Sequence, residues 1–170
     1  MIINKNIKLK IYKNLNNNGL LKKIAKLKNQ EWNYGLNNQL KWLRSNIKRN
    51  DLHILLQKNK KLLGYVLLRS RSIINMNKIK GKYFFFDTII IHKKFRNQKL
   101  SGVIINKANT IIKVKNKFSV LLCNKSKIKY YQKYNWKITK KIRILNYDSK
   151  KTIMVYNKKD LKNINISIDQ

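Results

Sequence analysis

Residues 87–102, Asp-Thr-Ile-Ile-Ile-His-Lys-Lys-Phe-Arg-Asn-Gln-Lys-Leu-Ser-Gly, join an apolar strand to a helix through a short polar loop. The apolar and aromatic run over residues 82–92 predicts a strand buried on both faces. Leu100, Ile104 and Ala108 recur at helical spacing and predict a helix over residues 100–113. A loop that leads into a helix N-terminus offers unpaired N–H groups and the positive end of the helix dipole. The stretch therefore predicts an anion site, and an ordinary strand–loop–helix crossover is the alternative.

A second strand-to-helix junction lies at residues 124–136, Asn-Lys-Ser-Lys-Ile-Lys-Tyr-Tyr-Gln-Lys-Tyr-Asn-Trp. Tyr130 and Tyr131 are adjacent in the expected helix, so their side chains point in different directions. One of them can pack in the core while the hydroxyl of the other faces a cleft. A phenol in that position is able to protonate a departing thiolate. Aromatic core packing is the alternative, and it is the favoured interpretation for Tyr130 and Tyr134.

The remaining patterns complete an α/β chain. A loop is expected at residues 70–81, and a second helix after a cap at Asn37 or Asn38. The other expected elements are helices at 20–32 and 126–134 and strands at 7–12, 52–57, 62–68, 118–123, 136–145 and 152–156. This order predicts a mixed central sheet with helices on both faces. The length of 170 residues suits one domain, which we place at residues 1–158, followed by a frayed tail at residues 159–170.

Charge is the most conspicuous feature of the composition. The chain has 41 Lys and Arg against 6 Asp and Glu, a formal net charge of +35. Such a charge attracts nucleic acid and other polyanions. The lysines, however, occupy surface-type positions along the whole chain, together with much Asn and Ile and no Pro. Compositional bias is therefore the favoured interpretation, and a selected nucleic-acid surface is the less favoured one.

Other classes of protein are excluded by simple counts. The single cysteine, Cys123, excludes an internal disulfide and a cysteine-based zinc site, and no metal site is expected. No apolar run approaches the ~20 residues of a membrane span. The N-terminal residues lack the apolar segment of a secretory signal, so we expect a cytoplasmic protein. It is expected to be a monomer or a homodimer.

Asp87 is the candidate general base. The six carboxylates of the chain are Glu31, Asp51, Asp87, Asp148, Asp160 and Asp169. Asp87 alone is embedded in an apolar strand, where desolvation would raise its pKa toward that of a useful base. The alternative is an Asp that pairs with a neighbouring Lys or backbone amide. His92 is a second candidate base, although its place at a strand end is more typical of a loop residue.

Both junctions resemble the GNAT superfamily of N-acetyltransferases. Residues 96–101, Arg-Asn-Gln-Lys-Leu-Ser, are in register with the family's Arg/Gln-x-x-Gly-x-Gly/Ala turn, and residues 91–95 stand where the family commonly has Val-His-Pro-x-Tyr. Residues 124–136 resemble its Asn-x-x-Ala-x-x-Phe-Tyr-x-Lys-x-Gly-Phe block. Two blocks in the family's order are more specific than either alone. The resemblance covers roughly residues 52–136 and implies the GNAT fold and an acetyl-CoA-dependent N-acetyltransferase.

The resemblance implies two sets of residues for the co-substrate acetyl-CoA. The backbone of Ile89, Ile90 and Ile91 would pair with the pantetheine arm like an added strand. Asn124 would contact the same arm. The pyrophosphate would be held, with Arg96 nearby, by backbone amides of Gln98, Lys99, Leu100, Ser101 and Gly102.

The resemblance also implies the catalytic roles. Tyr131 would protonate the coenzyme A thiolate, and Asp87 would take the amine proton directly or through water. Glu31 and Trp32 would border the acceptor cleft. The acceptor would be a primary amine of a small molecule, with an amino sugar as one candidate. The alternative function is a non-catalytic GNAT-fold module whose basic surface binds nucleic acid or another polyanion.

Three residues depart from the family pattern. Lys99 and Ser101 stand where the turn has glycines, and Asn135 replaces the glycine before the last aromatic residue. Glycine permits positive φ and a close approach of the backbone. Serine costs little, and asparagine tolerates the left-handed region. The Lys99 side chain either reinforces phosphate binding through its ammonium group or crowds the turn.

Overall fold

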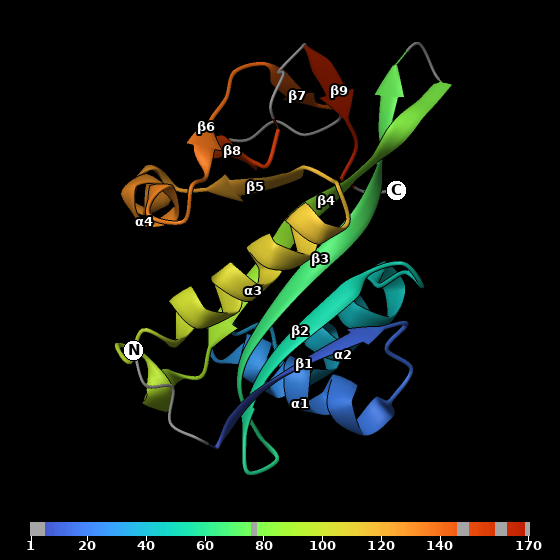
Figure 1. The fold of residues 1–170 in the computed structure, drawn as a ribbon. Coiled ribbons are helices and arrows are strands. Elements are labelled where there is room, and N and C mark those ends of the chain that lie inside the picture. The colour runs from blue at the N-terminus through green and yellow to red at the C-terminus, as the bar shows by residue number, and fades with distance from the viewer. Residues whose placement is uncertain (1–5, 76–77, 146–149, 159–162, 169–170) are drawn as a thin grey trace. The chain divides into compact units, whose positions relative to one another are not determined.

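The computed structural model describes residues 6–75, 78–145, 150–158 and 163–168 (Figure 1). The chain divides into two compact units. The first contains the described residues of Met1–Leu68 together with Thr88–Ile105, and the second those of Arg69–Asp87 and Asn106–Gln170. The single domain expected over residues 1–158 stays a prediction. In the described residues no helix is both long and apolar enough to cross a membrane.

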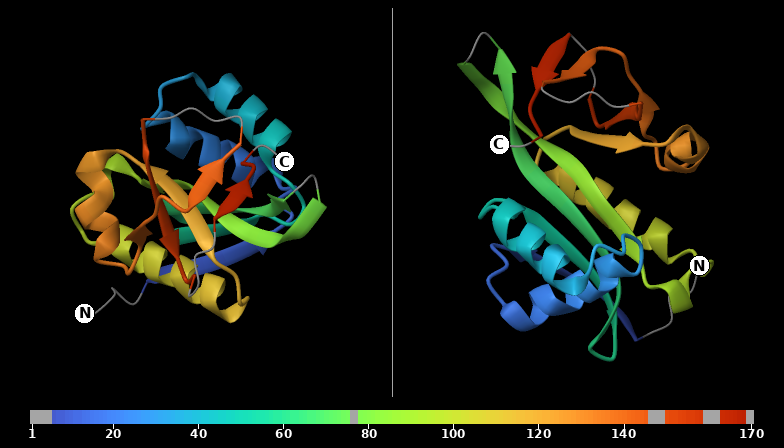
Figure 2. Two further views of the ribbon diagram at one scale, coloured as in Figure 1. Left: turned by 90° about the horizontal axis from the view of Figure 1, so that it is seen from above. Right: turned by 180° about the vertical axis from the view of Figure 1, so that it is seen from behind.

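The first unit is a sheet covered by two helices. Its strand order is β1-β2-β3-β4, in which β3 and β4 continue into the second unit. β1 pairs antiparallel with β2, and β2 with β3. In Figure 2 the helices α1 and α2 lie beside each other on one face of these strands. The elements are β1 (Ile7–Lys13), α1 (Asn18–Asn29), α2 (Leu36–Asn46), β2 (Leu52–Lys58), β3 (Lys61–Asn75), β4 (Lys78–Ile91), the 3₁₀ turn η1 (Lys93–Phe95) and α3 (Leu100–Val114).

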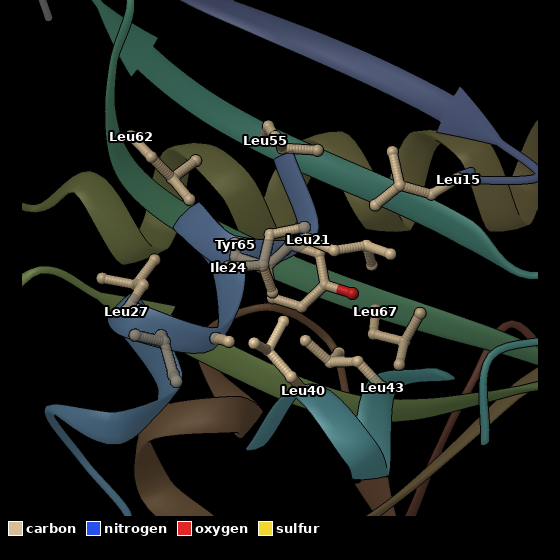
Figure 3. Packing of buried hydrophobic residues seen from close by; sticks show 12 residues of the cluster. Leu15, Leu21, Ile24, Leu27, Leu40, Leu43, Leu55, Leu62, Tyr65 and Leu67 are labelled. Carbon is tan, nitrogen blue, oxygen red and sulfur yellow. The ribbon is translucent and has the colours of Figure 1, made fainter. Parts of the chain in front are cut away.

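Apolar spacing explains how α1 and α2 attach to the sheet. Asn17 caps α1, because its side chain accepts a hydrogen bond from the Leu20 N–H at 2.8 Å. Figure 3 shows side chains from both helices meeting those of β2 and β3 in one apolar core. The buried residues it labels are Leu15, Leu21, Ile24, Leu27, Leu40, Leu43, Leu55, Leu62, Tyr65 and Leu67. The cap of α2 is Gly35, with φ of 84°, so the prediction of Asn37 or Asn38 is wrong by two or three residues.

The second unit is built on the strand order β3-β4-β5-β8-β6. β5 runs parallel to β4, with Phe84 opposite Ser119, and antiparallel to β8. β7 runs parallel to β9. The new elements are β5 (Ser119–Cys123), the 3₁₀ turn η2 (Lys125–Lys127), α4 (Ile128–Gln132), β6 (Lys137–Ile138), β7 (Ile142–Ile144), β8 (Thr152–Tyr156) and β9 (Ile164–Ile166). The strand expected at residues 136–145 is thus two short strands.

Two predictions about the second unit are wrong for one shared reason. The loop expected at residues 70–81 is the end of β3 and the start of β4, apart from residues 76–77, which lie outside the described residues. The tail expected at residues 159–170 contains β9, whose Ile166 is buried opposite Ile73 of β3. The buried Arg71 side chain also donates to the Ile168 carbonyl at 3.2 Å. The end of β3 and the C-terminal segment pair with each other, and sequence patterns do not reveal such long-range pairing.

The predicted fold class is confirmed. The sheet is mixed and mostly antiparallel, with parallel pairing between β4 and β5 and between β7 and β9. Helices flank it, as the α/β order predicted.

Candidate active site

The loop between β4 and α3 lies within the first unit. The His92 N–H donates to the Leu63 carbonyl at 2.8 Å, which continues the pairing with β3 beyond the end of β4. The His92 ring nitrogen Nδ1 then accepts from the Lys94 N–H at 3.2 Å and caps η1. Partial burial, followed by the charges of Lys61, Lys94 and Arg96, lowers the pKa of His92. His92 is thus a loop residue in a positive electrostatic environment, and its imidazole is a weaker base than a free one.

The backbone of residues 97–102, which we call the cradle, has two left-handed residues just before α3 begins. Asn97 and Lys99 have φ of 62° and 57°, whereas Gln98 between them is not left-handed. Alternation of right- and left-handed residues turns successive N–H groups toward one side and forms a nest for anions. The Gly102 N–H donates to the Lys99 carbonyl at 3.1 Å where α3 begins. The N–H groups of the first helical turn have no partner within the helix. Lys99 therefore keeps the backbone conformation for which the GNAT turn uses glycine.

The side chains of the cradle leave its backbone accessible. Gln98 and Lys99 are exposed, Ser101 is half-buried, and Leu100 is buried. Arg96 lies just before the cradle and forms an ion pair with Glu31. Arg96 Nη2 donates to Glu31 Oε2 at 2.5 Å, and Arg96 Nε donates to the Ile91 carbonyl at 3.3 Å.

The end of β4 approaches β3 closely. Ile90 is buried, and Ile89 and Ile91 are half-buried. Gly64 of β3 lies opposite, where an added Cβ would come within 2.7 Å of Ile91 Cδ1 and 3.2 Å of the Ile90 carbonyl oxygen. A larger residue here would force the Ile91 side chain to shift and the Ile90 carbonyl to move by a few tenths of an ångström. Sequence analysis overlooked Gly64.

Glu31 and Trp32 lie in the turn between α1 and α2. Trp32 is 37% exposed, and its carbonyl accepts from the Gln39 side chain at 2.7 Å. The Lys28 ammonium lies 3.6 Å from the centroid of the Trp42 ring and 5.8 Å from that of Trp32. The structure therefore brings these aromatic residues together around a cation. Glu31, expected to border the acceptor cleft, forms an ion pair with Arg96.

Asp87 belongs to the second unit and is ion-paired. Its Oδ2 accepts from Arg69 Nη1 at 3.3 Å, and the two side chains are 19% and 6% exposed respectively. Of the two interpretations left open by the sequence, pairing is the one that the structure records, with Arg69 in place of a lysine. Sequence analysis missed Arg69 because it ended the strand at residue 68 and expected a loop at residues 70–81, whereas β3 includes Arg69 and lies next to β4.

Tyr131 lies in α4 of the second unit and is half-buried. Its ring meets those of Phe86 and Trp136 edge-on, with centroids 6.5 and 6.3 Å apart. Burial, together with the nearby Cys123 and Tyr130, raises the pKa of Tyr131, so its hydroxyl stays protonated well above neutral pH. This hydroxyl makes no hydrogen bond with the part of the chain that the structure describes. Its state fits a proton donor.

Asn124 and Asn135 flank the segment that carries Tyr131. Asn124 is exposed and makes no capping hydrogen bond through its side chain, which leaves that amide available to a ligand. Asn135 has φ of 63°, which confirms that asparagine takes the left-handed conformation at the position of the family's glycine.

Comparisons with solved structures identify the fold. A PaiA N-acetyltransferase from Thermoplasma acidophilum in complex with coenzyme A is 15% identical, covering 87% of this chain and 98% of that one with a TM-score of 0.58. An aminoglycoside N-acetyltransferase in complex with CoA is 12% identical, with coverages of 85% and 95% and a TM-score of 0.63. The Escherichia coli ribosomal-protein-S18-alanine N-acetyltransferase is 12% identical, with coverages of 87% and 92% and a TM-score of 0.61. No family model and no curated protein matches the sequence.

Proposed function

We propose that this chain, which has the fold of the GNAT N-acetyltransferases, is an acetyl-CoA-dependent N-acetyltransferase that acts on a primary amine of a small molecule. The observation that carries the proposal is the cradle. Lys99 is held at φ of 57° next to a helix N-terminus, although a left-handed lysine is unfavourable by ~1–2 kcal/mol. Left-handed residues just before a helix N-terminus can turn backbone N–H groups toward an anion such as a diphosphate. Two of the similar structures hold coenzyme A.

The residues of the cradle fit the diphosphate of acetyl-CoA, which supplies an activated acetyl thioester when bound. Amides of Gln98 to Gly102 would bind the diphosphate together with the helix dipole of α3. The exposed ammonium of Lys99 adds a positive charge at the same turn. The main chain of Ile89 to Ile91 would bind the pantetheine arm, with the Asn124 amide as a further contact.

Two side chains of the second unit would move the protons. Asp87, which pairs with Arg69, would accept a proton from the amine directly or through a water molecule. Tyr131, protonated at neutral pH, would give its proton to the leaving thiolate. Main-chain amides would stabilise the oxyanion that forms between these two transfers.

An amino sugar is the acceptor class that we favour. Trp32 and Tyr34 lie in the turn after α1 and are 37% and 68% exposed, and Trp42 of α2 contacts the same Lys28 ammonium as Trp32. Flat aromatic faces suit the apolar face of a sugar ring better than a flexible polyamine. The chain has only 6 Asp and Glu, and this scarcity of carboxylates does not favour a polycationic acceptor.

Calorimetry with coenzyme A and acetyl-CoA tests the proposal first, and thiol release over a panel of amino sugars, amino acids and peptides tests it second. Saturable binding followed by acceptor-dependent release of free thiol is expected. The alternative of a non-catalytic module predicts the opposite: no saturable binding of coenzyme A, and an affinity for nucleic acid that falls steeply with salt.

A further inference from the structure

Glu31 and Arg96 form an ion pair beside the cradle. Arg96 is fixed in two directions, through Nη2 to Glu31 and through Nε to the Ile91 carbonyl. Both partners are exposed, Arg96 at 41% and Glu31 at 44%. Exposed pairs are held weakly, so a stronger anion can displace the carboxylate from the guanidinium.

The turn that carries Glu31 is tied to its surroundings on both sides. The Gln30 side chain accepts from the Lys93 N–H at 3.1 Å, which links the turn to the loop after β4. On the other side, the Trp32 carbonyl accepts from Gln39 of α2. Any displacement of Glu31 therefore acts on a turn that connects the loop before the cradle with α2.

The charges around this pair are strongly one-sided. No Asp or Glu occurs in the sequence between Asp87 and Asp148, so the cradle segment itself is purely cationic. The lowered pKa of His92, to which Lys61, Lys94 and Arg96 contribute, reports the same positive field. Glu31 brings a carboxylate into that field. There it offsets the charge of the Arg96 guanidinium next to the cradle.

We propose that Glu31 is an internal competitor of the cofactor, whose carboxylate occupies the Arg96 guanidinium until the diphosphate of acetyl-CoA displaces it. The identity of the ligand rests on the proposed function. Displacement frees the Glu31 side chain in a turn that Gln30 joins to the loop after β4 and Trp32 joins to α2, so cofactor binding is transmitted to the residues between α1 and α2. The opposite role, in which Glu31 holds Arg96 ready for the diphosphate, predicts the opposite effect of removing the carboxylate.

The substitution Glu31→Gln separates the two roles, measured by calorimetry with coenzyme A and, independently, with inorganic pyrophosphate. An ion pair of ordinary surface strength lowers the fraction of molecules with an unpaired Arg96 several-fold. The Glu31→Gln variant is therefore expected to bind both probes about two to five times more tightly. The gain should shrink at high salt, because screening weakens the pair. Unchanged or weaker binding by Glu31→Gln would overturn the proposal.

Two controls assign the effect to the pair. Asn16→Lys raises the net charge by the same amount at an exposed site before α1, whose 12 residues separate it from Glu31 by about 18 Å, and it should leave affinity nearly unchanged. In an Arg96→Gln background, Glu31→Gln should give no further gain, whereas a merely structural role of Glu31 would persist there. If the parent protein binds neither probe, the proposed function fails together with this inference. If it binds both and Glu31→Gln changes nothing, only this inference fails.

Discussion

Replacing Lys99 by glycine should stabilise the protein and weaken its hold on coenzyme A. At φ of 57° the lysine Cβ is too close to the following carbonyl, a conflict of ~1–2 kcal/mol that glycine removes. This gain in the free energy of unfolding is reduced by ~0.5–1 kcal/mol, because glycine gives the unfolded chain more conformational freedom. The net gain is about 0.5–1 kcal/mol, which corresponds to a rise in melting temperature of about 1–4 °C for a chain of this length.

Lys60 provides a matched control for this substitution. It is also an exposed lysine, with φ of 61°, but it lies in the turn between β2 and β3. Lys60→Gly should therefore raise the melting temperature by a similar amount in calorimetric scans. Only Lys99→Gly removes an ammonium group from the cradle, so it alone should weaken coenzyme A binding, about threefold at low salt. Loss of stability in Lys99→Gly, or tighter binding of coenzyme A, would refute this reasoning, since the second result means that the lysine crowds the cradle.

Three further changes probe other parts of the structure. Tyr131→Phe should lower kcat by about 10²–10⁴-fold while the affinity for acetyl-CoA, measured by calorimetry, is unchanged; a parent-like turnover would remove Tyr131 from the mechanism. Gly64→Ala should lower the free energy of unfolding in urea by about 1–3 kcal/mol and weaken acetyl-CoA binding, because the new methyl group meets Ile91 Cδ1 and the Ile90 carbonyl. Burial lowers the pKa of His53 to about 4, so the folded state binds its proton less readily than the unfolded chain. The stability from this group is complete above pH 6.5 and is lost as the pH falls toward 4, by about 3 kcal/mol in total. Unfolding measured across that range should have a shallower slope in His53→Gln, and an equal slope would contradict this assignment.

Sequence patterns predicted the elements whose apolar residues follow a regular spacing within the element itself. The apolar run that became β4 and the helical spacing of α3 are readable because burial acts on consecutive residues. The pairing of β3 with β9 is not readable in that way. Arg71 reads as a solvent-exposed residue, yet it is 1% exposed because carbonyl groups of Ser70 and Ile168 satisfy its guanidinium. Only the folded C-terminal segment supplies that second acceptor.

The candidate residues divide in the same manner. The position of the cradle and the left-handed conformation of Asn135 followed from local sequence, since a turn is specified by a few consecutive residues. The partners of the charged residues did not. Asp87 pairs with Arg69, and Glu31 pairs with Arg96, through contacts between segments that are distant in the sequence. In a chain with so many cations, the sequence alone cannot select which of them a given carboxylate will meet.

The missing glycines of the two family blocks have a common explanation in the backbone. Among the described residues, the non-glycine positions with positive φ are Lys60, Lys99, Asn14, Asn59, Asn97, Asn116, Asn135 and Asn157. Asparagine predominates because its short side chain can hydrogen-bond locally and so offsets part of the left-handed strain. A chain with 5 glycines thus builds its turns from the asparagine that its composition supplies. Lysine lacks that compensation, and at Lys60 it follows Asn59 in a tight hairpin turn. Lys99 has the same left-handed strain at the start of α3, where backbone amides face the site proposed for a diphosphate. It is the conformation rather than the residue type that a backbone cradle requires, so loss of the motif's glycine is compatible with the proposed activity.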